Sequence, residues 1–412
     1  HSFPTRRSSD LVLAPVATAG AAIPVGPSGG AAGKAWTRTA LGPQHYPGVH
    51  IDWDVPIRMS DGTILKSNVY RPADAAGRPV ATKTPTIVNL TPYTKLVSTI
   101  AAETLQHPIL APITEQIINM INLTGTPIEG FGDILNGQNG GAFRTFTVDK
   151  SLVQAGYSFV VVDVRGTGFS QGKWDVFQRR EQQDTIEVID WASKQRFSNG
   201  KVGMTGMSYS AINQIYAANK NPAPLKAIFP LVPGGDLTRD IVAPGGALGV
   251  GFLPLWLAMV NATKMVPDVA SMFTGTFDWK WLADRLANPL VFFPQLMAAL
   301  FTPDINSIPP DMKRLVVPGS RERLDWMDHA DNIKVPTMIN GMWFDLFTNS
   351  EVRMFNKIPL PMGKKQLIMG EGYHITPGHD HGRPGTPPRI NVLQRAWFDK
   401  WLKGIDNGID KY

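Results

Sequence analysis

Ser208, in the segment GMSYS at residues 206–210, is the residue whose surroundings point most directly to chemistry. An apolar run precedes this segment, and a stretch with helical character comes after it. A serine on a sharp strand-to-helix turn presents its hydroxyl at the edge of a sheet, and the next backbone N–H faces an incoming carbonyl oxygen. Because the turn packs closely on its neighbours, it needs small residues at Gly206 and Ser210. The pentapeptide predicts a nucleophilic serine, although an ordinary Gly/Ser turn fits it as well.

A serine hydroxyl also needs a base that accepts its proton and an acid group that orients this base. In sheets of alternating strands and helices, these groups have the order serine, aspartate or glutamate, histidine. Asp345 and His374 have that order. Each comes a few residues after a predicted strand, at 337–340 and 366–369, where open α/β sheets place their sites.

Other acidic groups compete for the orienting role. Three aspartates lie just before the strand expected at residues 337–340, namely Asp325, Asp328 and Asp331. A group that precedes its strand leaves from the opposite edge of the sheet, so Asp345 is the better candidate.

A second histidine cluster comes after His374. His379 and His381 flank Asp380, and these side chains could instead hold a metal ion. The segment is rich in Gly and Pro, and no second group of ligands is evident in the sequence. We therefore expect no metal and no cofactor.

The composition is that of a globular protein. Of the 412 residues, 43% are hydrophobic and 18% are charged, and the basic residues behind the net charge of +6 are scattered. Nucleic-acid binding usually needs basic residues that cluster on one surface, so we expect no nucleic-acid partner. No apolar run reaches the roughly 18 residues that span a bilayer, so we expect no integral membrane span. The chain has no cysteine, which excludes disulfides and thiolate catalysis.

Residues 1–45 are interpreted as a leader that precedes the folded part. Residues 1–11 (HSFPTRRSSDL) are polar, differ in character from the rest of the chain and resemble a foreign N-terminus. Residues 11–19 form a short apolar stretch that ends in Ala-Thr-Ala, which is typical of the end of a secretory signal peptide. The sequence thus predicts an exported protein, and it leaves the oligomeric state open.

Strands and helices alternate after the leader. Residues 50–55 and 64–70 alternate apolar and polar side chains around a Ser-Asp-Gly turn, as an antiparallel hairpin does. Further strands are expected at 86–90, 158–163, 202–205, 225–232, 337–340 and 366–369, and helices at 181–194, 211–220 and 389–403. This order predicts a mostly parallel, doubly wound α/β sheet with antiparallel edge strands.

Two long segments interrupt the alternation: one lies within the first part of the core (residues 46–239), and the other separates this part from the second (residues 315–412). The first, 96–143, is helical in texture, and the second, 240–314, is rich in Trp, Phe, Met and Leu. Inserts of this length are typical of lids or caps over a site. Their apolar content fits a cap that buries its own underside and equally an apolar wall for an acyl group.

Several segments between residues 46 and 412 carry a family resemblance. They are MSDGTIL at 59–65, YRP at 70–72, TPYTK at 91–95, DVRGTGFSQG at 163–172, GKVGMTGMSY at 200–209, LKAIFP at 225–230, WFDKWLKG at 397–404 and DNG at 406–408. In this order they resemble the CocE/NonD family of α/β-hydrolases, which is S15-type and X-Pro dipeptidyl-peptidase-like. The resemblance implies an α/β-hydrolase fold with helical cap insertions.

The resemblance also implies a role for each matching residue. Ser208 matches the nucleophile, Asp345 the orienting acid and His374 the base. The hydroxyl of Tyr93 and the backbone N–H of Tyr209 match the two donors of an oxyanion hole, which meet the charge of a tetrahedral intermediate. The implied activity is that of a serine hydrolase, which cleaves a small-molecule acyl ester or amide through an acyl-enzyme.

Two alternatives share this chemistry, an X-Pro dipeptidyl-peptidase and an acyltransferase that uses the same acyl-enzyme. Members of the family also carry a C-terminal jelly-roll domain after the segment that ends here at Gly404, and we expect either that this domain is absent or that the chain is a fragment. The family places Pro-Trp before its base, where this chain has Glu371 and Gly372. The glycine-rich segment at 163–172 lacks the lysine of a phosphate-binding loop, so Arg165 is expected to brace neighbouring loops.

Overall fold

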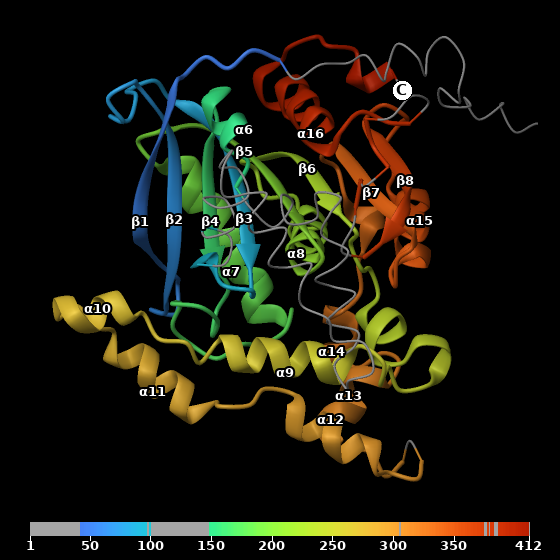
Figure 1. Cartoon of the computed structure of the whole chain (residues 1–412). Helices are drawn as coiled ribbons and strands as arrows, with labels where there is room; N and C mark the ends of the chain where they lie inside the picture. The colour runs from blue at the N-terminus through green and yellow to red at the C-terminus, as the bar shows by residue number, and fades with distance from the viewer. Residues whose placement is uncertain are drawn as a thin grey trace, which may run out of the picture.

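An eight-stranded sheet runs through the centre of the molecule in the order β1-β2-β4-β3-β5-β6-β7-β8 (Figure 1). The computed structural model describes residues 42–96, 99, 148–304, 306–374, 377–378, 380–382 and 386–411. The strands are β1 (Gly48–Arg58), β2 (Ile64–Ala73), β3 (Thr84–Thr91), β4 (Ser158–Asp163), β5 (Ser198–Met207), β6 (Leu225–Leu231), β7 (Thr337–Phe344) and β8 (Lys365–Tyr373). β1 and β2 pair antiparallel with each other, and β2 pairs antiparallel with β4. The strands from β4 to β8 pair in parallel, as predicted.

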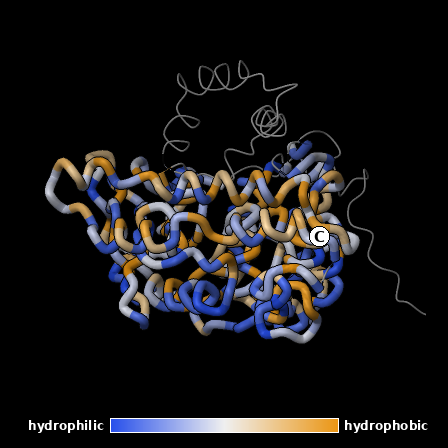
Figure 2. Tube along the Cα trace, turned by 90° about the horizontal axis from the view of Figure 1, so that it is seen from below, coloured by the Kyte–Doolittle hydropathy of each residue, from blue (hydrophilic) through white to orange (hydrophobic). Residues whose placement is uncertain are grey.

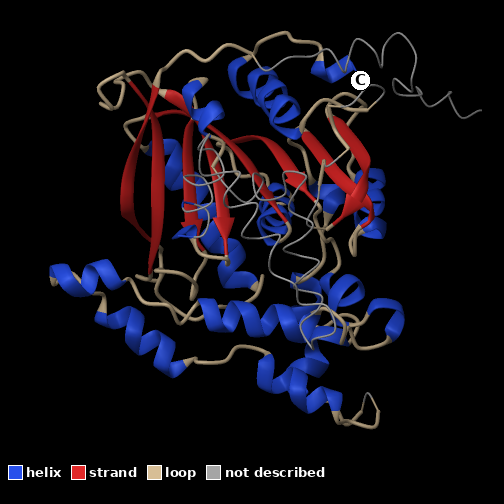
Figure 3. Ribbon diagram, viewed as in Figure 1, coloured by secondary structure: helices blue, strands red, loops and turns tan. Residues whose placement is uncertain are grey.

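Helices cover both faces of this sheet (Figure 3). They are α6 (Lys150–Gln154), α7 (Arg179–Lys194), α8 (Tyr209–Ala218), α15 (Thr348–Lys357) and α16 (Ile390–Phe398), the last continued by a π-helical turn, η5 (Asp399–Lys403). The side chains of β4 alternate between two apolar cores, because successive strand residues point to opposite faces. One core contains side chains of α7, α8 and α15, and the other contains those of α6 and α16. Burial on both faces explains why the parallel strands read as continuous apolar runs.

The two late strands are longer than predicted. The predicted strand at 337–340 continues to Phe344 in β7, and the one at 366–369 continues to Tyr373 in β8. Parallel pairing between the two strands extends to these last residues, which keeps their backbone groups hydrogen-bonded. Asp345 and His374 therefore come directly after their strands and do not lie several residues further on.

Helices α9 to α14 lie together below the lower end of the sheet in Figure 1, past the carboxyl ends of the parallel strands. They are α9 (Leu253–Thr263), α10 (Val269–Thr274), α11 (Trp279–Ala287), α12 (Phe293–Leu300), α13 (Pro310–Val316) and α14 (Arg321–Asp325). In the view from below, apolar and hydrophilic stretches alternate along the chain (Figure 2). None of the described helices is both long and apolar enough to cross a bilayer. The predicted insert at 96–143 lies outside the described residues apart from Leu96 and Thr99, as does the predicted leader up to residue 41.

The glycine-rich loop at residues 163–172 joins these helices to the sheet. Arg285 of α11 is buried and donates to the carbonyl oxygens of Gly168 (3.2 Å) and Ser170 (2.7 Å). On its other side the loop is braced by Arg165, whose guanidinium pairs with Asp184 at 2.6 Å. The loop therefore has a structural role, as the sequence predicted, because it connects these helices to the sheet.

Candidate active site

Ser208 forms the turn between β5 and α8. Its backbone has φ 57° and ψ −117°, a conformation that residues other than glycine rarely adopt. The turn is held by its own hydrogen bonds, because Ser208 N donates to Leu231 O at 3.0 Å and Ser208 O accepts from Ala211 N at 2.9 Å. Strain of this kind persists only where the surroundings over-determine it, and it gathers at functional sites.

Small residues around the turn are required by geometry. Gly206 has φ +144°, and a Cβ placed on it would lie 2.5 Å from Ser210 Cβ and 3.2 Å from Asn89 Nδ2. Non-bonded carbon atoms do not approach this closely without displacement. The sequence expectation of small residues at both flanking positions agrees with this packing.

The structure brings the three predicted side chains into one hydrogen-bonded chain. His374 Nε2 lies 2.7 Å from Ser208 Oγ, and His374 Nδ1 lies 2.5 Å from Asp345 Oδ1. The Asp345 side chain is fully buried, whereas 15% of the His374 side chain is exposed. The Phe347 ring packs nearly perpendicular to the imidazole, with ring centroids 5.2 Å apart. This arrangement lets the imidazole accept a proton from Ser208 while Asp345 orients the ring.

The competing aspartates lie in other interactions. Asp325 pairs with Arg179 at 3.1 Å, and Asp328 pairs with Lys357 at 3.2 Å. Asp331 is exposed in the short 3₁₀ helix η4 (Ala330–Asn332) that precedes β7. The ion pairs of Asp325 and Asp328 and the exposure of Asp331 therefore agree with the predicted preference for Asp345.

The second histidine cluster makes no described metal site. His379 lies outside the described residues, and the buried His381 has its Nε2 3.8 Å from Asp380. Within the described ranges, no group of three or more His, Cys, Asp or Glu side chains is placed to hold a metal ion.

Tyr93 reaches the same site from the loop after β3. Its hydroxyl group is hydrogen-bonded with Ser208, and it accepts a hydrogen bond from Trp256 Nε1 at 3.2 Å. Burial raises the pKa of the Tyr93 phenol, so the hydroxyl keeps its proton near neutral pH. Trp256 belongs to α9 and was not predicted, because no motif or spacing links residues so far apart in the chain.

Tyr209 comes directly after Ser208 as the first residue of α8. Its backbone N–H has no carbonyl of the same helix to donate to, which leaves this group available at the site. Its side chain points into the core, where the hydroxyl donates to Glu181 Oε1 and accepts from Trp174 Nε1 at 3.0 Å. The Phe177 ring stacks on the phenol at 3.7 Å, so the first turn of α8 is firmly anchored.

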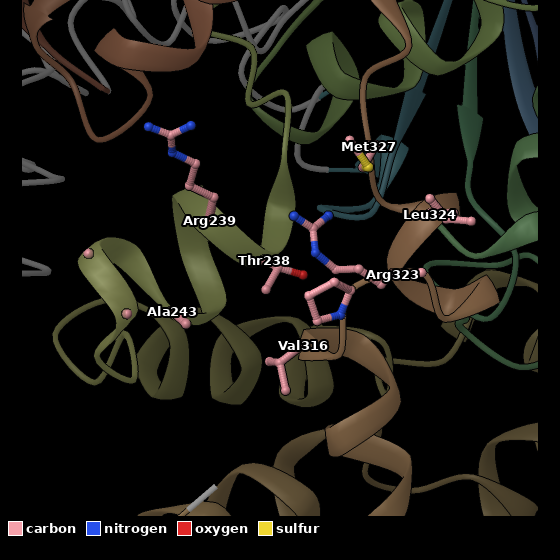
Figure 4. A pocket seen from close by; sticks show the side chains of 11 residues that line it. Thr238, Arg239, Ala243, Val316, Arg323, Leu324 and Met327 are labelled. Carbon is pink, nitrogen blue, oxygen red and sulfur yellow. The ribbon is translucent and has the colours of Figure 1, made fainter.

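A cavity of about 530 Å³ lies apart from these residues, between η2 (Thr238–Val242) and the α13–α14 pair. Thr238, Val316 and Arg323 are among its lining residues (Figure 4). None of the five predicted site residues lines it, and Arg323 is already paired with Asp236 at 2.5 Å.

Comparison with known families identifies the chain. The model of the family described as X-Pro dipeptidyl-peptidase (S15 family) matches residues 61–376. The chain belongs to this family of hydrolases. The matched range contains Ser208, Asp345, His374, Tyr93 and Tyr209, so the whole candidate site lies inside it.

Individual relatives are distant. Cocaine esterase from Rhodococcus sp. (strain MB1 Bresler) is 25% identical over 266 residues, which are 61% of this chain and 46% of that protein. A putative Xaa-Pro dipeptidyl-peptidase from Rhodopirellula baltica is 24% identical and covers 64% of this chain and 40% of its own length. The chain spans about half the length of the curated relatives it matches.

Among solved structures, a CocE/NonD family hydrolase from Staphylococcus aureus superposes with a TM-score of 0.55 at 20% identity. The match covers 88% of this chain and 52% of the other chain. Together with the sheet order and the turn at Ser208, it confirms the predicted α/β-hydrolase fold.

Gly206→Ala is expected to destabilise the protein by about 3 kcal/mol or more, because the new methyl group overlaps the Ser210 side chain. Gly200→Ala is the matched control, since Gly200 also has a positive φ (+87°) but nothing within 4 Å of its Cβ position. It bears only the backbone strain, about 1–2 kcal/mol. Denaturant unfolding of both variants measures the difference, and equal losses would contradict the packing argument.

Glu181→Gln is expected to change how stability depends on pH. Burial raises the pKa of Glu181 to about 8 from its usual 4.5, so the folded state binds an extra proton between these values. Stability contributed by the wild-type residue therefore falls as pH rises from about 4.5 to about 8. The glutamine variant lacks this titration and should gain stability relative to wild type between pH 5 and pH 9, by at least about 1 kcal/mol. Denaturant unfolding of both proteins at pH 5 and pH 9 measures this gain. The same difference in free energy of unfolding at both pH values would show that Glu181 is ionised throughout.

Proposed function

We propose that this protein is a serine hydrolase that cleaves acyl esters through a covalent acyl-enzyme. The observation that carries the proposal is the chain of hydrogen bonds from Ser208 Oγ through the His374 imidazole to the Asp345 carboxylate. Hydrolase family membership and the strained turn at Ser208 support it.

In the first half-reaction, Ser208 Oγ forms a bond to the carbonyl carbon of the substrate while His374 Nε2 takes the hydroxyl proton. The carbonyl π-electrons move to oxygen, and Asp345 stabilises the imidazolium. When the tetrahedral intermediate collapses, the bond to the leaving group breaks and His374 returns the proton to it. Water then attacks the acyl-enzyme by the same route and releases the acid.

The oxyanion would be held by two donors, the backbone N–H of Tyr209 and the hydroxyl of Tyr93. Because Trp256 Nε1 already donates to the Tyr93 oxygen, the phenolic hydrogen must point elsewhere, toward Ser208 and the forming oxyanion. Donors fixed in this way before the reaction stabilise the charge without reorganisation. Trp256 lies in α9, so the α9–α14 segment, which we propose as a cap over the site, takes part in arranging the oxyanion hole.

Esters are proposed as the substrates because cocaine esterase is among the relatives that this chain resembles. The peptidase remains the alternative, because the family description and a further relative name that activity. Release of 4-nitrophenol from a short acyl ester, without release of 4-nitroaniline from Gly-Pro-4-nitroanilide, supports the esterase. The reverse pattern supports the peptidase, and formation of a new ester with an added alcohol identifies an acyltransferase.

Ser208→Ala is expected to lower kcat/KM for a 4-nitrophenyl acyl ester by about 10⁴-fold or more, because the nucleophile is lost. A fluorophosphonate should label the wild type at one serine, and peptide mass mapping should place the label on Ser208. Ser210→Ala is the matched control, since it removes a neighbouring hydroxyl outside the hydrogen-bonded chain and should keep the label. A Ser208→Ala variant that retains wild-type turnover would overturn the proposed function.

Tyr93→Phe is expected to lower kcat about 10²- to 10³-fold with little change in KM, because the lost donor acts on charge that develops in the transition state. Trp256→Phe keeps an aromatic ring but removes the bond to Tyr93, and a smaller loss is expected. Steady-state kinetics with the same ester measure both. A Tyr93→Phe variant with unchanged kcat would exclude the phenol from the oxyanion hole.

A further inference from the structure

A second carboxyl group lies behind the Asp345–His374 pair. Glu351 is on the first turn of α15, and its side chain is completely buried (0% exposed). Its carboxyl group lies against that of Asp345, whose side chain is also completely buried. His374 is hydrogen-bonded to Asp345 Oδ1, whereas Asp345 Oδ2 is buried without a hydrogen-bond partner among the described residues.

Among the described residues, no lysine or arginine side chain pairs with these two acids. No basic side chain of the described residues donates a hydrogen bond to Asp345 Oδ2 or to either carboxyl oxygen of Glu351. The charged groups of α15 and of the elements packed on it are engaged elsewhere or exposed. They are Arg353 with Asp240, Lys357 with Asp328, Lys365 with the carbonyls of Phe355 and Ile358, and the exposed Asp331 and Glu371.

The fold leaves a space shaped for this carboxyl group. Gly341 in β7 lies directly beneath it, and a Cβ on Gly341 would come 2.0 Å from Glu351 Oε2 and 2.4 Å from Glu351 Cδ. Any side chain at residue 341 would displace Glu351. The carboxyl group is thus packed between the strand that carries Asp345 and the helix that comes after it.

Two buried carboxyl groups in contact do not both ionise, because like charges in a medium of low dielectric constant repel strongly. One of them keeps a proton. His374 donates to Asp345, and the ionised form of Asp345 is the one that this bond stabilises.

We propose that Glu351 is a protonated carboxylic acid that donates its O–H to Asp345 Oδ2 and thereby positions the carboxylate that orients His374. Burial, then the charge of Asp345, then the hydrogen bond with Asp345 raise the pKa of Glu351 well above its usual value, against an opposing effect of the Met342 backbone. Glu351 is a positioning residue, since it acts on the reaction only through Asp345. This role rests on the proposed function, whereas the protonation state does not.

The protonation state has a test that needs no activity. At neutral pH, the infrared difference between wild type and Glu351→Gln should contain the C=O band of a carboxylic acid that is present in wild type only. Protein labelled with ¹³C at the glutamate side-chain carboxyl should show this band at lower frequency. A missing band, or one that the label leaves in place, would overturn the proposal, because the proton would then be absent or on Asp345.

The positioning role has a kinetic test. Glu351→Gln offers an amide N–H to Asp345, so we expect kcat within about 3-fold of wild type and an unmoved acid limb of the kcat–pH profile. Glu351→Leu fills the space without a donor, and kcat should fall about 10- to 100-fold at unchanged KM. If Glu351 were ionised, its replacement by glutamine would remove a negative charge near His374 and shift the acid limb to lower pH by about a unit or more. That shift, or full activity in Glu351→Leu, would overturn the proposal.

Ser350→Ala controls for damage to the helix. Ser350 is buried on the same turn of α15 but is bonded to Asp240 and not to Asp345. Ser350→Ala should lower thermal stability without the loss of kcat expected for Glu351→Leu. If both variants lose kcat equally, the role of Glu351 is only structural. Failure of the proposed function appears differently, as a wild type that does not hydrolyse esters or label at Ser208, and the infrared result then still decides the state of Glu351.

Discussion

Parallel pairing of β7 with β8 is the constraint on which the site depends. The two strands remain paired as far as Phe344 and Tyr373, across a register shift after Met342, so the next residues of both leave the sheet side by side. Asp345 and His374 are those residues, and their hydrogen bond needs no long loop to bring them together. The nucleophile is tied to the same edge through β6, because Ser208 N donates to Leu231 O at the end of that strand. Three side chains from distant parts of the sequence thus meet because three backbone ladders end at one edge.

Burial around this edge controls protonation. Glu181 behind Tyr209 and Glu351 behind Asp345 both lie where the charged form of an acid is poorly solvated, and the pKa of each is raised. Asp345 is the carboxyl group in contact with His374. Protonated acids act here as hydrogen-bond donors or neutral partners, and they add no further negative charge behind the imidazole.

Two contacts connect the helices below the sheet to the site and to the loop beside it. Arg285 holds the loop at 163–172 through backbone carbonyls, which fixes the position of α11 relative to the sheet. Trp256 of α9 then reaches Tyr93 by a single hydrogen bond. A displacement of these helices would alter the hydrogen bond from Trp256 Nε1 to the Tyr93 hydroxyl.

The sequence by itself determined the order of strands and helices, the turn at Ser208 and the choice of Asp345 and His374. Those features depend on local signals, such as apolar runs, glycine positions and the ends of predicted strands. Only the tertiary structure decided that Trp256 meets Tyr93 and that Glu351 meets Asp345. Trp256 and Tyr93 are far apart in the chain, and Glu351 reads in sequence as an ordinary polar residue of an amphipathic helix. Contacts of this kind arise from how elements pack in three dimensions, and neither helical nor strand periodicity records them.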